Sequence, residues 1–190
     1  TVHGLENLEA AKRQGKGVLL VGAHYTTLDM GGVLVSLFSD VDVMYRPHTN
    51  PLFDQFMKKS RERFCHKVID RTDIRSVIKS LKAGDVLWYA PDQDYGRNHS
   101  VFAPFFGVEA ASIKATARFA KINQSPVIIL KHHRNLQNDG YTLSFSAPLE
   151  NYPSGNDIED ATIINQQLES AIRECPEQYM WVHRRFFHEL

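Results

Sequence analysis

Short apolar runs rich in Val, Ile and Leu alternate with amphipathic stretches along this chain. Most of the runs lack a strict apolar–polar alternation, which is typical of strands buried on both faces. We expect strands at 17–23, 41–45, 85–90, 126–130 and 141–146. Helical periodicity predicts helices at 5–14, 27–38, 52–64, 73–82, 111–122, 158–173 and 176–187. The order of these elements predicts an α/β fold with a mixed, mostly parallel sheet flanked by helices.

Local signals refine this prediction. Asp73 is a good helix start and Gly84 a good helix stop. The stretch 141–146 alternates between apolar and polar residues, so we expect an edge strand with one wetter face. A loop rich in Pro, Gly and Asn covers 148–157, but too few residues follow it to form a second domain. We therefore expect one domain over 1–190.

Charge and cysteine content exclude several classes of protein. The 22 basic residues balance 22 acidic ones, so no overall field favours a nucleic-acid partner. Cys65 and Cys175 have neither zinc-site nor disulfide-framework spacing, so we expect two buried, reduced thiols. The nucleophile elbow of serine hydrolases, nucleotide-binding glycine motifs and the HExxH zinc motif are all absent from the sequence. His99, His132 and His133 do not predict a metal site, because adjacent strand residues point to opposite faces.

The stretch VGAHYTTLDMGG, residues 21–32, passes from a strand into a helix. His24 falls just past the strand, at the sheet edge where α/β proteins bind ligands. A neutral imidazole beside a helix amino end suits a general base, and Asp29 in the first helical turn could fix its tautomer. The alternative is an ordinary loop histidine next to a capping box formed by Thr26 and Asp29.

Further candidates follow the other strands. Asp92 and Asp94, in WYAPDQDYG, are placed like catalytic or ligand residues, although the same residue types form turns. Arg46 and Arg61 could hold an anion such as a phosphate, or could belong to a solvated helix face. Arg184, in the aromatic and basic stretch MWVHRRFF, suits lipid headgroups, although a packed amphipathic helix explains that stretch nearly as well.

Two expectations concern the walls of such a site. Backbone N–H groups near Gly22 or Gly96 are candidate donors to an oxyanion. Phe102, Phe105, Phe106 and Trp88 are candidates for the floor of an apolar groove, although packing under a loop is the commoner use of such residues.

The order of the motifs resembles the late lipid A acyltransferases of Gram-negative bacteria, the lauroyl and myristoyl transferases of the HtrB/MsbB type. The resemblance covers nearly the whole chain. It rests on GVLLVGAHYTTLDMGG, YRPHTNPLFDQF followed by SRER, VIDR, LKAGDVLWYAPDQDYG, SVFAPFFGVEAAS and PEQYMWVHRRF. Six motifs in one order make the match specific.

The resemblance implies a glycerolipid-acyltransferase-like fold and an enzyme that needs no cofactor or metal. A fatty acyl chain would pass from acyl carrier protein to a hydroxyl of the lipid A precursor, di-Kdo lipid IVA, without an acyl-enzyme. His24 matches the catalytic base of the family and Asp29 its acidic partner, for which many members carry Glu. Because Asp is shorter by one methylene, Asp29 must lie closer to His24, within hydrogen-bond reach.

The resemblance also implies substrate-binding residues and partners. Arg61 matches the arginine of the family's basic helix and Asp92 the acid of its Pro-Asp-x-Asp-Tyr-Gly block. With Arg46, Asp94 and Arg184 they are the candidates for binding substrate. The expected partners are acyl carrier protein, the lipid A precursor and the membrane surface, at the cytoplasmic face of the inner membrane. Members of the family carry an amino-terminal membrane helix, for which this chain shows no apolar segment of sufficient length.

Three alternatives remain open. The first is an acyltransferase acting on another glycolipid or glycerolipid acceptor. The second is a lipid-binding module whose His24 and Asp29 are structural. A hydrolase or metalloenzyme is a more distant third.

Overall fold

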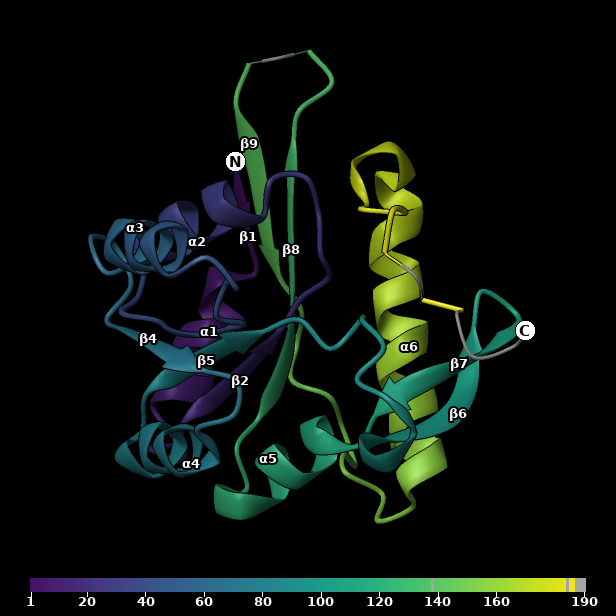
Figure 1. Ribbon diagram of the computed structural model, residues 1–190. Coiled ribbons are helices and arrows are strands. Elements are labelled where there is room, and N and C mark those ends of the chain that lie inside the picture. The colour runs from purple at the N-terminus through teal and green to yellow at the C-terminus, as the bar shows by residue number, and fades with distance from the viewer. Residues whose placement is uncertain (138, 184, 187–190) are drawn as a thin grey trace.

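The computed structural model describes residues 1–137, 139–183 and 185–186. Its main sheet has seven strands in the order β1-β9-β8-β2-β5-β3-β4 (Figure 1). These strands are β1 (Val2–His3), β2 (Val18–Val21), β3 (Asp42–Tyr45), β4 (Lys67–Asp70), β5 (Val86–Tyr89), β8 (Val127–Arg134) and β9 (Tyr141–Phe145). All neighbouring pairs are parallel except β8 and β9, so the predicted mixed, mostly parallel sheet is confirmed.

The described residues form six α-helices beside the sheet. They are α1 (Leu5–Lys12), α2 (Leu28–Ser36), α3 (Pro51–Arg61), α4 (Ile74–Ala83), α5 (Ala115–Asn123) and α6 (Asp157–Glu174). Alternate residues of the central strands divide the core into two layers. Leu19 and Val21 of β2 pack with α4, α5 and α6, whereas Val18 and Leu20 pack with α1 and α2. No helix within the described residues combines the length and the apolar character needed to cross a bilayer.

Several local predictions are confirmed. The side chain of Asp73 caps α4 by accepting from the N–H of Ser76, and Gly84 ends that helix at a φ of 90°. Every residue of β2 and β5 is buried, as expected of strands without alternation. Cys65 and Cys175 are buried free thiols.

The strand predicted at 141–146 forms, but its predicted edge position is wrong. This segment forms β9, which lies between β8 and the two-residue strand β1. Its alternation reflects two unequal faces, because Leu143 and Phe145 are buried whereas Thr142 and Ser144 are partly exposed. Strands β1 and β4 are missing from the sequence prediction.

A second difference lies between 100 and 113. The strands β6 (Ser100–Phe105) and β7 (Val108–Ile113) form an antiparallel hairpin, where a loop and the start of a helix were predicted. Phe106 and Gly107 connect the strands at φ values of 52° and 79°, which suits a tight hairpin turn. The hairpin lies beside α6 (Figure 1), and the Asn165 amide of that helix donates to the Pro104 carbonyl at 2.9 Å.

The predicted helix at 176–187 is also wrong over its described residues. Only the 3-10 turn η2 (Pro176–Gln178) is helical, like the turn η1 (Arg97–His99) earlier in the chain. The residues after η2 pair with the loop that follows β2, because Tyr179 forms an antiparallel bridge with Tyr25. Tertiary pairing thus replaces the helix that the local pattern favours.

Candidate functional site

A cavity of about 350 Å³ lies at the carboxyl ends of β2, β3 and β5, beneath α2 and the end of α3. His24, from the loop after β2, and His183, from the carboxyl-terminal segment, both line it. Polar lining comes also from Asp29, Arg61 and Gln93. The location agrees with the general placement of ligand sites at the carboxyl edge of parallel sheets.

The imidazole of His24 is held by Asp92. Their contact joins Nδ1 of His24 to Oδ1 of Asp92 at 2.5 Å, while the backbone N–H of His24 donates to Oδ2 at 2.9 Å. A carboxylate only accepts, so the bond assigns a proton to Nδ1. Nε2 is then the ring nitrogen left for a molecule in the cavity.

Strand register explains this pairing. β2 and β5 are parallel neighbours, and Val21 lies opposite Tyr89. His24 and Asp92 each lie three residues past that pair. Both chains leave the sheet side by side, so residues 68 positions apart in sequence meet at its edge.

Burial distinguishes the two partners. Asp92 is 1% exposed, and it lies behind the ring rather than in the cavity wall. Burial alone would raise the pKa of Asp92, but the hydrogen bonds and charge of His24 outweigh it and lower the pKa below its usual value. Asp92 is thus an ionised carboxylate placed to orient the imidazole. Its buried position corrects the expectation that it contacts substrate.

Asp29 has a different partner. Arg61 donates from Nε and Nη2 to Oδ1 of Asp29, at 3.0 and 2.8 Å. His24 lies outside α2 and Asp29 in its first turn, as predicted. The predicted hydrogen bond between Asp29 and His24, however, is not formed among the described residues. The reason is that Asp29 turns toward α3, while Asp92 already occupies Nδ1 of the ring.

The predicted capping box does not form either. Thr27 is the N-cap of α2, and its side chain makes no cap hydrogen bond. Its hydroxyl instead contacts Nδ1 of the buried His132 at 2.9 Å. A Cβ on Gly31 would come within 2.8 Å of the His132 ring, so glycine allows α2 to lie close against β8.

The carboxyl-terminal segment fixes the loop that carries His24. Met180 donates its N–H to the His24 carbonyl at 2.9 Å, and Thr26 donates to the Gln178 carbonyl at 2.8 Å. The same segment places the ring of His183 at 5.2 Å from that of His24, edge to face. Burial and the nearby His24 lower the pKa of His183, so this second imidazole is neutral at pH 7.

Three arginines of the described residues line the same cavity. Arg46 and Arg71 line the cavity with Arg61. Tyr45 lies opposite Asp70 in the parallel register of β3 and β4, so Arg46 and Arg71 are the next residues at neighbouring strand ends. The guanidinium of Arg71 lies over the ring of Tyr95, 5.1 Å from its centre. Arg46 and Arg61 therefore line the same cavity as His24, and their role in binding substrate stays a prediction.

Other predicted residues lie elsewhere. Asp94 accepts from the Gly96 N–H at 2.7 Å in a turn, and Gly22 donates to the Tyr89 carbonyl, so neither glycine N–H is available to an oxyanion. Arg184 lies outside the described residues.

Of the four aromatic candidates for the groove floor, Trp88 lines the cavity. Phe105 is buried in the core, and Phe106 packs against Trp181 and Arg173. Phe102 is 41% exposed on the hairpin. Packing, the commoner use of such residues, therefore accounts for Phe105 and Phe106.

Sequence reasoning missed three features of this site: the Asp92 contact with His24, the cavity position of His183, and Arg71. A sequence signal existed for Asp92 and Arg71. Asp92 lies three residues past β5, as His24 lies three past β2, and Arg71 lies one residue past β4, as Arg46 lies one past β3. It becomes usable only when the strand order is known. His183 had no comparable signal.

Fold and site define an α/β domain with a histidine–carboxylate pair at the carboxyl edge of its sheet, facing a cavity with three arginines. The chain belongs to the family of bacterial lipid A biosynthesis acyltransferases, whose sequence model matches residues 1–188. The family resemblance seen in the motifs is thereby confirmed.

Individual relatives agree with this assignment. The chain is 37% identical to the lipid A biosynthesis palmitoleoyltransferase of Escherichia coli K12, over 97% of the chain and 60% of the relative. It is 38% identical to the lauroyltransferase of the same strain, over 97% of the chain and 61% of the relative. A lipid A biosynthesis acyltransferase of Haemophilus influenzae is 39% identical, over 97% and 60%. The chain thus spans about three fifths of the length of these relatives.

Proposed function

We propose that this chain transfers a fatty acyl group from acyl carrier protein to a hydroxyl of the lipid A precursor, di-Kdo lipid IVA. The observation that carries the proposal is the His24–Asp92 contact of 2.5 Å beside the arginine-lined cavity. With Nδ1 bonded to a buried carboxylate, Nε2 of His24 is the nitrogen that can accept a proton in general-base catalysis. Membership of the lipid A acyltransferase family supplies the substrate class.

In the proposed reaction, Nε2 of His24 takes the proton of the acceptor hydroxyl. The oxygen attacks the thioester carbonyl carbon, so that a C–O bond forms and the C–S bond breaks. The imidazolium returns its proton to the departing thiolate. Asp92 stabilises the imidazolium meanwhile, and general-base catalysis of this kind contributes about 10²–10⁴-fold in rate. No acyl-enzyme, cofactor or metal enters this scheme.

The arginines would bind the phosphate groups of the substrates. One cavity is lined by Arg46, Arg61 and Arg71. A guanidinium group binds phosphate through two parallel hydrogen bonds. Asp29 would act through Arg61, by holding its guanidinium at the cavity wall. We assign Asp29 this positioning role in place of direct contact with the base.

Direct transfer requires that two substrates meet. A second, more open cavity of about 830 Å³ lies between the start of α2, the β8–β9 turn and residues 177–180. Leu28 and Asp29 line both cavities, so the two spaces adjoin at the start of α2. This arrangement supports a mechanism in which donor and acceptor are bound together.

The proposed partners follow from the proposed substrates. Acyl carrier protein would deliver the thioester, and the lipid acceptor would be met at a membrane surface. We propose the cytoplasmic face of the inner membrane as the place of action, because the donor would come from a carrier protein in solution and the acceptor from the membrane.

The test is His24→Ala, assayed by mass spectrometry of the acceptor after incubation with acyl carrier thioester. We expect transfer to be lost, with His133→Ala on β8 as the matched control. Substantial transfer by a folded His24→Ala variant would exclude the base assignment. Glycerol phosphate acceptors in parallel reactions separate the proposed substrate from a glycerolipid acceptor. A wild-type chain that binds lipid but consumes no thioester in a single turnover would be a lipid-binding module.

A further inference from the structure

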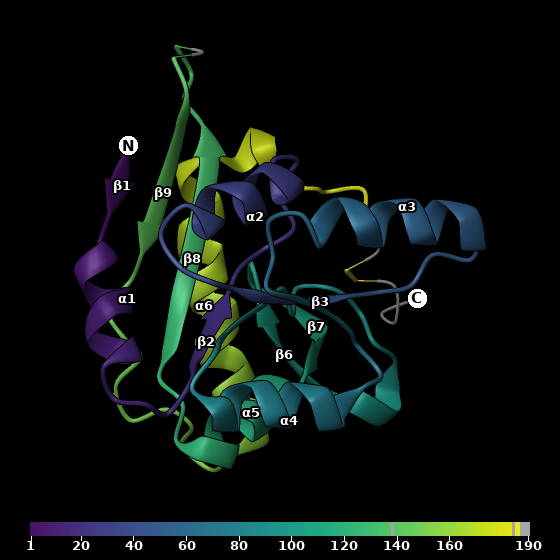
Figure 2. The same ribbon diagram turned by 90° about the vertical axis from the view of Figure 1, so that its left-hand side faces the viewer.

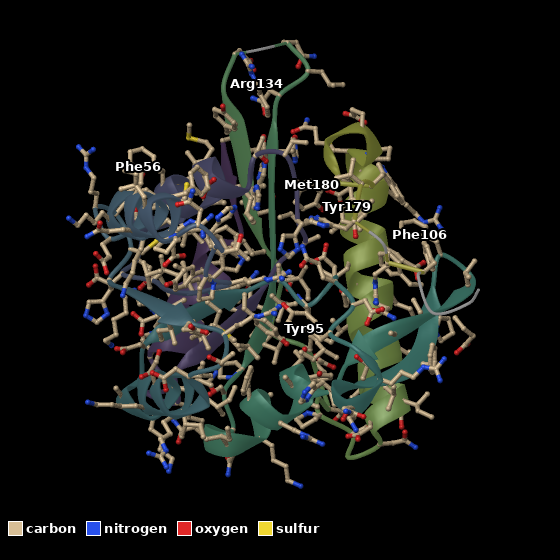
Figure 3. The ribbon with its side chains drawn as sticks, in the orientation of Figure 1. Phe56, Tyr95, Phe106, Arg134, Tyr179 and Met180 are labelled. Atoms are coloured by element: carbon tan, nitrogen blue, oxygen red, sulfur yellow. The ribbon has the colours of Figure 1, made fainter. Side chains whose placement is uncertain are left out.

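Helix α3 carries an apolar face that the described residues leave largely exposed, although the His48 ring packs against Phe53 with 4.7 Å between ring centres. None of its residues is buried. Leu52 is 76% exposed, Phe56 67% and Phe53 47%. Figure 3 shows Phe56 pointing away from the body of the molecule, and Figure 2 shows α3 on the outside, next to α2. We call Leu52, Phe53 and Phe56 the apolar α3 face.

The helix is held by its ends rather than by this face. Asn50 caps it by accepting from the N–H groups of Leu52 and Phe53, and Pro51 occupies its first turn. At the other end Arg61 is paired with Asp29 of α2. Packing therefore does not explain why two phenylalanines and a leucine occupy one side of the helix.

The spacing makes the face continuous. At 100° per residue, Leu52, Phe53 and Phe56 fall within about 100° of the helix circumference. Lys59 lies at the border of this arc, while Lys58 lies on the far side, with its Nζ 3.9 Å from Glu62. An apolar arc with a flanking cation is the pattern of a helix that lies in a lipid interface.

Charge points to an anionic surface. The whole chain is balanced, yet residues 46–63 hold five basic residues against two acidic ones. Of these cations, Lys58 is paired with Glu62 and Arg61 with Asp29, whereas Lys59 borders the apolar α3 face. An apolar face with a cation at its border complements a bilayer that carries anionic headgroups.

We propose that the apolar α3 face inserts into an anionic lipid surface. The choice of lipid as occupant rests on the proposed function, since the acceptor would be a lipid. Arg61 at the end of α3 lines the cavity that His24 faces, so insertion would bring the cavity to the lipid interface. The helix would thereby orient the site toward a membrane-borne substrate.

The test is co-sedimentation of the chain with vesicles of phosphatidylcholine alone, or of phosphatidylcholine and phosphatidylglycerol in equal parts. The double variant Phe53→Ser/Phe56→Ser should lose at least about tenfold in binding to the mixed vesicles, because two exposed aromatic groups no longer enter the apolar phase. The control is Ile158→Ser, which replaces an apolar side chain that is 54% exposed on α6 by the same polar residue. Circular dichroism verifies that each variant is folded.

Charge is tested separately. Lys59→Ala should weaken binding to the mixed vesicles about fivefold and leave binding to phosphatidylcholine unchanged, because one cation near an anionic surface contributes about 1 kcal/mol. Lys82→Ala on α4 is the matched control. Equal binding to both vesicle types, with no effect of Lys59→Ala, would overturn the anionic part of the proposal.

Other occupants give distinct results. A wild-type chain that does not bind vesicles, or a double variant that binds as well as wild type, would overturn the proposal. So would a wild-type dimer in size-exclusion chromatography that the double variant abolishes, because a second copy would then cover the face. Acyl transfer to an acceptor dispersed in detergent should survive the double variant. Vesicle binding without any transfer would reject the proposed function and leave the docking surface standing.

Discussion

Replacing Asp92 by Asn tests the site at its most informative point. The substitution keeps the shape of a side chain that is buried and removes its charge. The Asn carbonyl can still accept from the His24 backbone N–H, which now bonds the carboxylate at 2.9 Å. The NH₂ group of the Asn then faces Nδ1 of the ring. Either two donors face each other, or the ring proton moves to Nε2, which can then no longer act as a base.

The magnitude follows from the geometry. The carboxylate oxygen lies 2.5 Å from Nδ1, and the Asp92 side chain has no exposed area. Two unit charges about 4 Å apart at an effective dielectric constant of about 20 attract by about 4 kcal/mol. Losing this stabilisation of the imidazolium costs about 10³-fold in rate, at about 1.4 kcal/mol per tenfold. Single-turnover transfer from acyl carrier thioester measures the chemical step directly.

A double-mutant cycle then separates the two carboxylates. Asp29→Asn and Arg61→Gln break the same ion pair, so their effects on the rate should be less than additive. Asp29→Asn and Asp92→Asn should be additive, because Asp29 acts on the cavity wall and Asp92 on the base. Near wild-type turnover by a folded Asp92→Asn variant would refute the reasoning. Strong coupling between the Asp29 and Asp92 substitutions would instead mean that both carboxylates act through His24.

Three further predictions concern stability, each measured by urea unfolding. Gly31→Ala should destabilise the chain, because a methyl group pushed into the His132 ring costs about 1–3 kcal/mol, which outweighs the gain in helix propensity of about 1 kcal/mol. An unchanged urea midpoint would contradict the close approach of α2 to His132. Lys67→Met should cost about 1–3 kcal/mol, because the fully buried Asp42 loses its 3.2 Å contact with the ammonium group, whereas Lys82→Met should cost little. Burial lowers the pKa of His132 from 6.5 to about 4. Between these pH values the unfolded chain binds a proton that the folded chain does not, so the free energy of unfolding falls as the pH drops from 6.5 to 4, by about 3 kcal/mol in total. A free energy of unfolding that stays constant over this window would contradict a buried, neutral His132.

Much of the fold can be predicted from local pattern because the pattern and the tertiary structure agree there. The central strands are buried on both faces, and the runs 17–23 and 85–90 signal this by their lack of alternation. Capping chemistry locates the start and the end of α4. Prediction fails where contacts between separate segments decide. The segment after η2 pairs with Tyr25, which no local window contains. The β6–β7 hairpin pairs residues that are close in sequence, but it packs against α6, which lies far along the chain.

The candidate site divides along the same line. His24 is identified by its place after a strand, which is local information. Its partner is not, because a carboxylate five residues away is the nearer choice in sequence and Asp92 the nearer one in space. Asp29 belongs to α2, whose first turn faces α3, so its side chain meets Arg61. Short spacing in sequence therefore paired His24 with Asp29, whereas the structure pairs it with Asp92.

The register of parallel strands predicts which residues meet at the sheet edge, whereas short spacing in sequence does not. A position n residues past one strand lies beside the position n residues past its parallel neighbour, as long as both chains continue in the same direction. His24 and Asp92 obey this at three residues past Val21 and Tyr89. Arg46 and Arg71 obey it at one residue past β3 and β4 and line one cavity. A sheet edge thus brings together a histidine, a carboxylate and two arginines from four strand ends, and strand order is the information needed to find them.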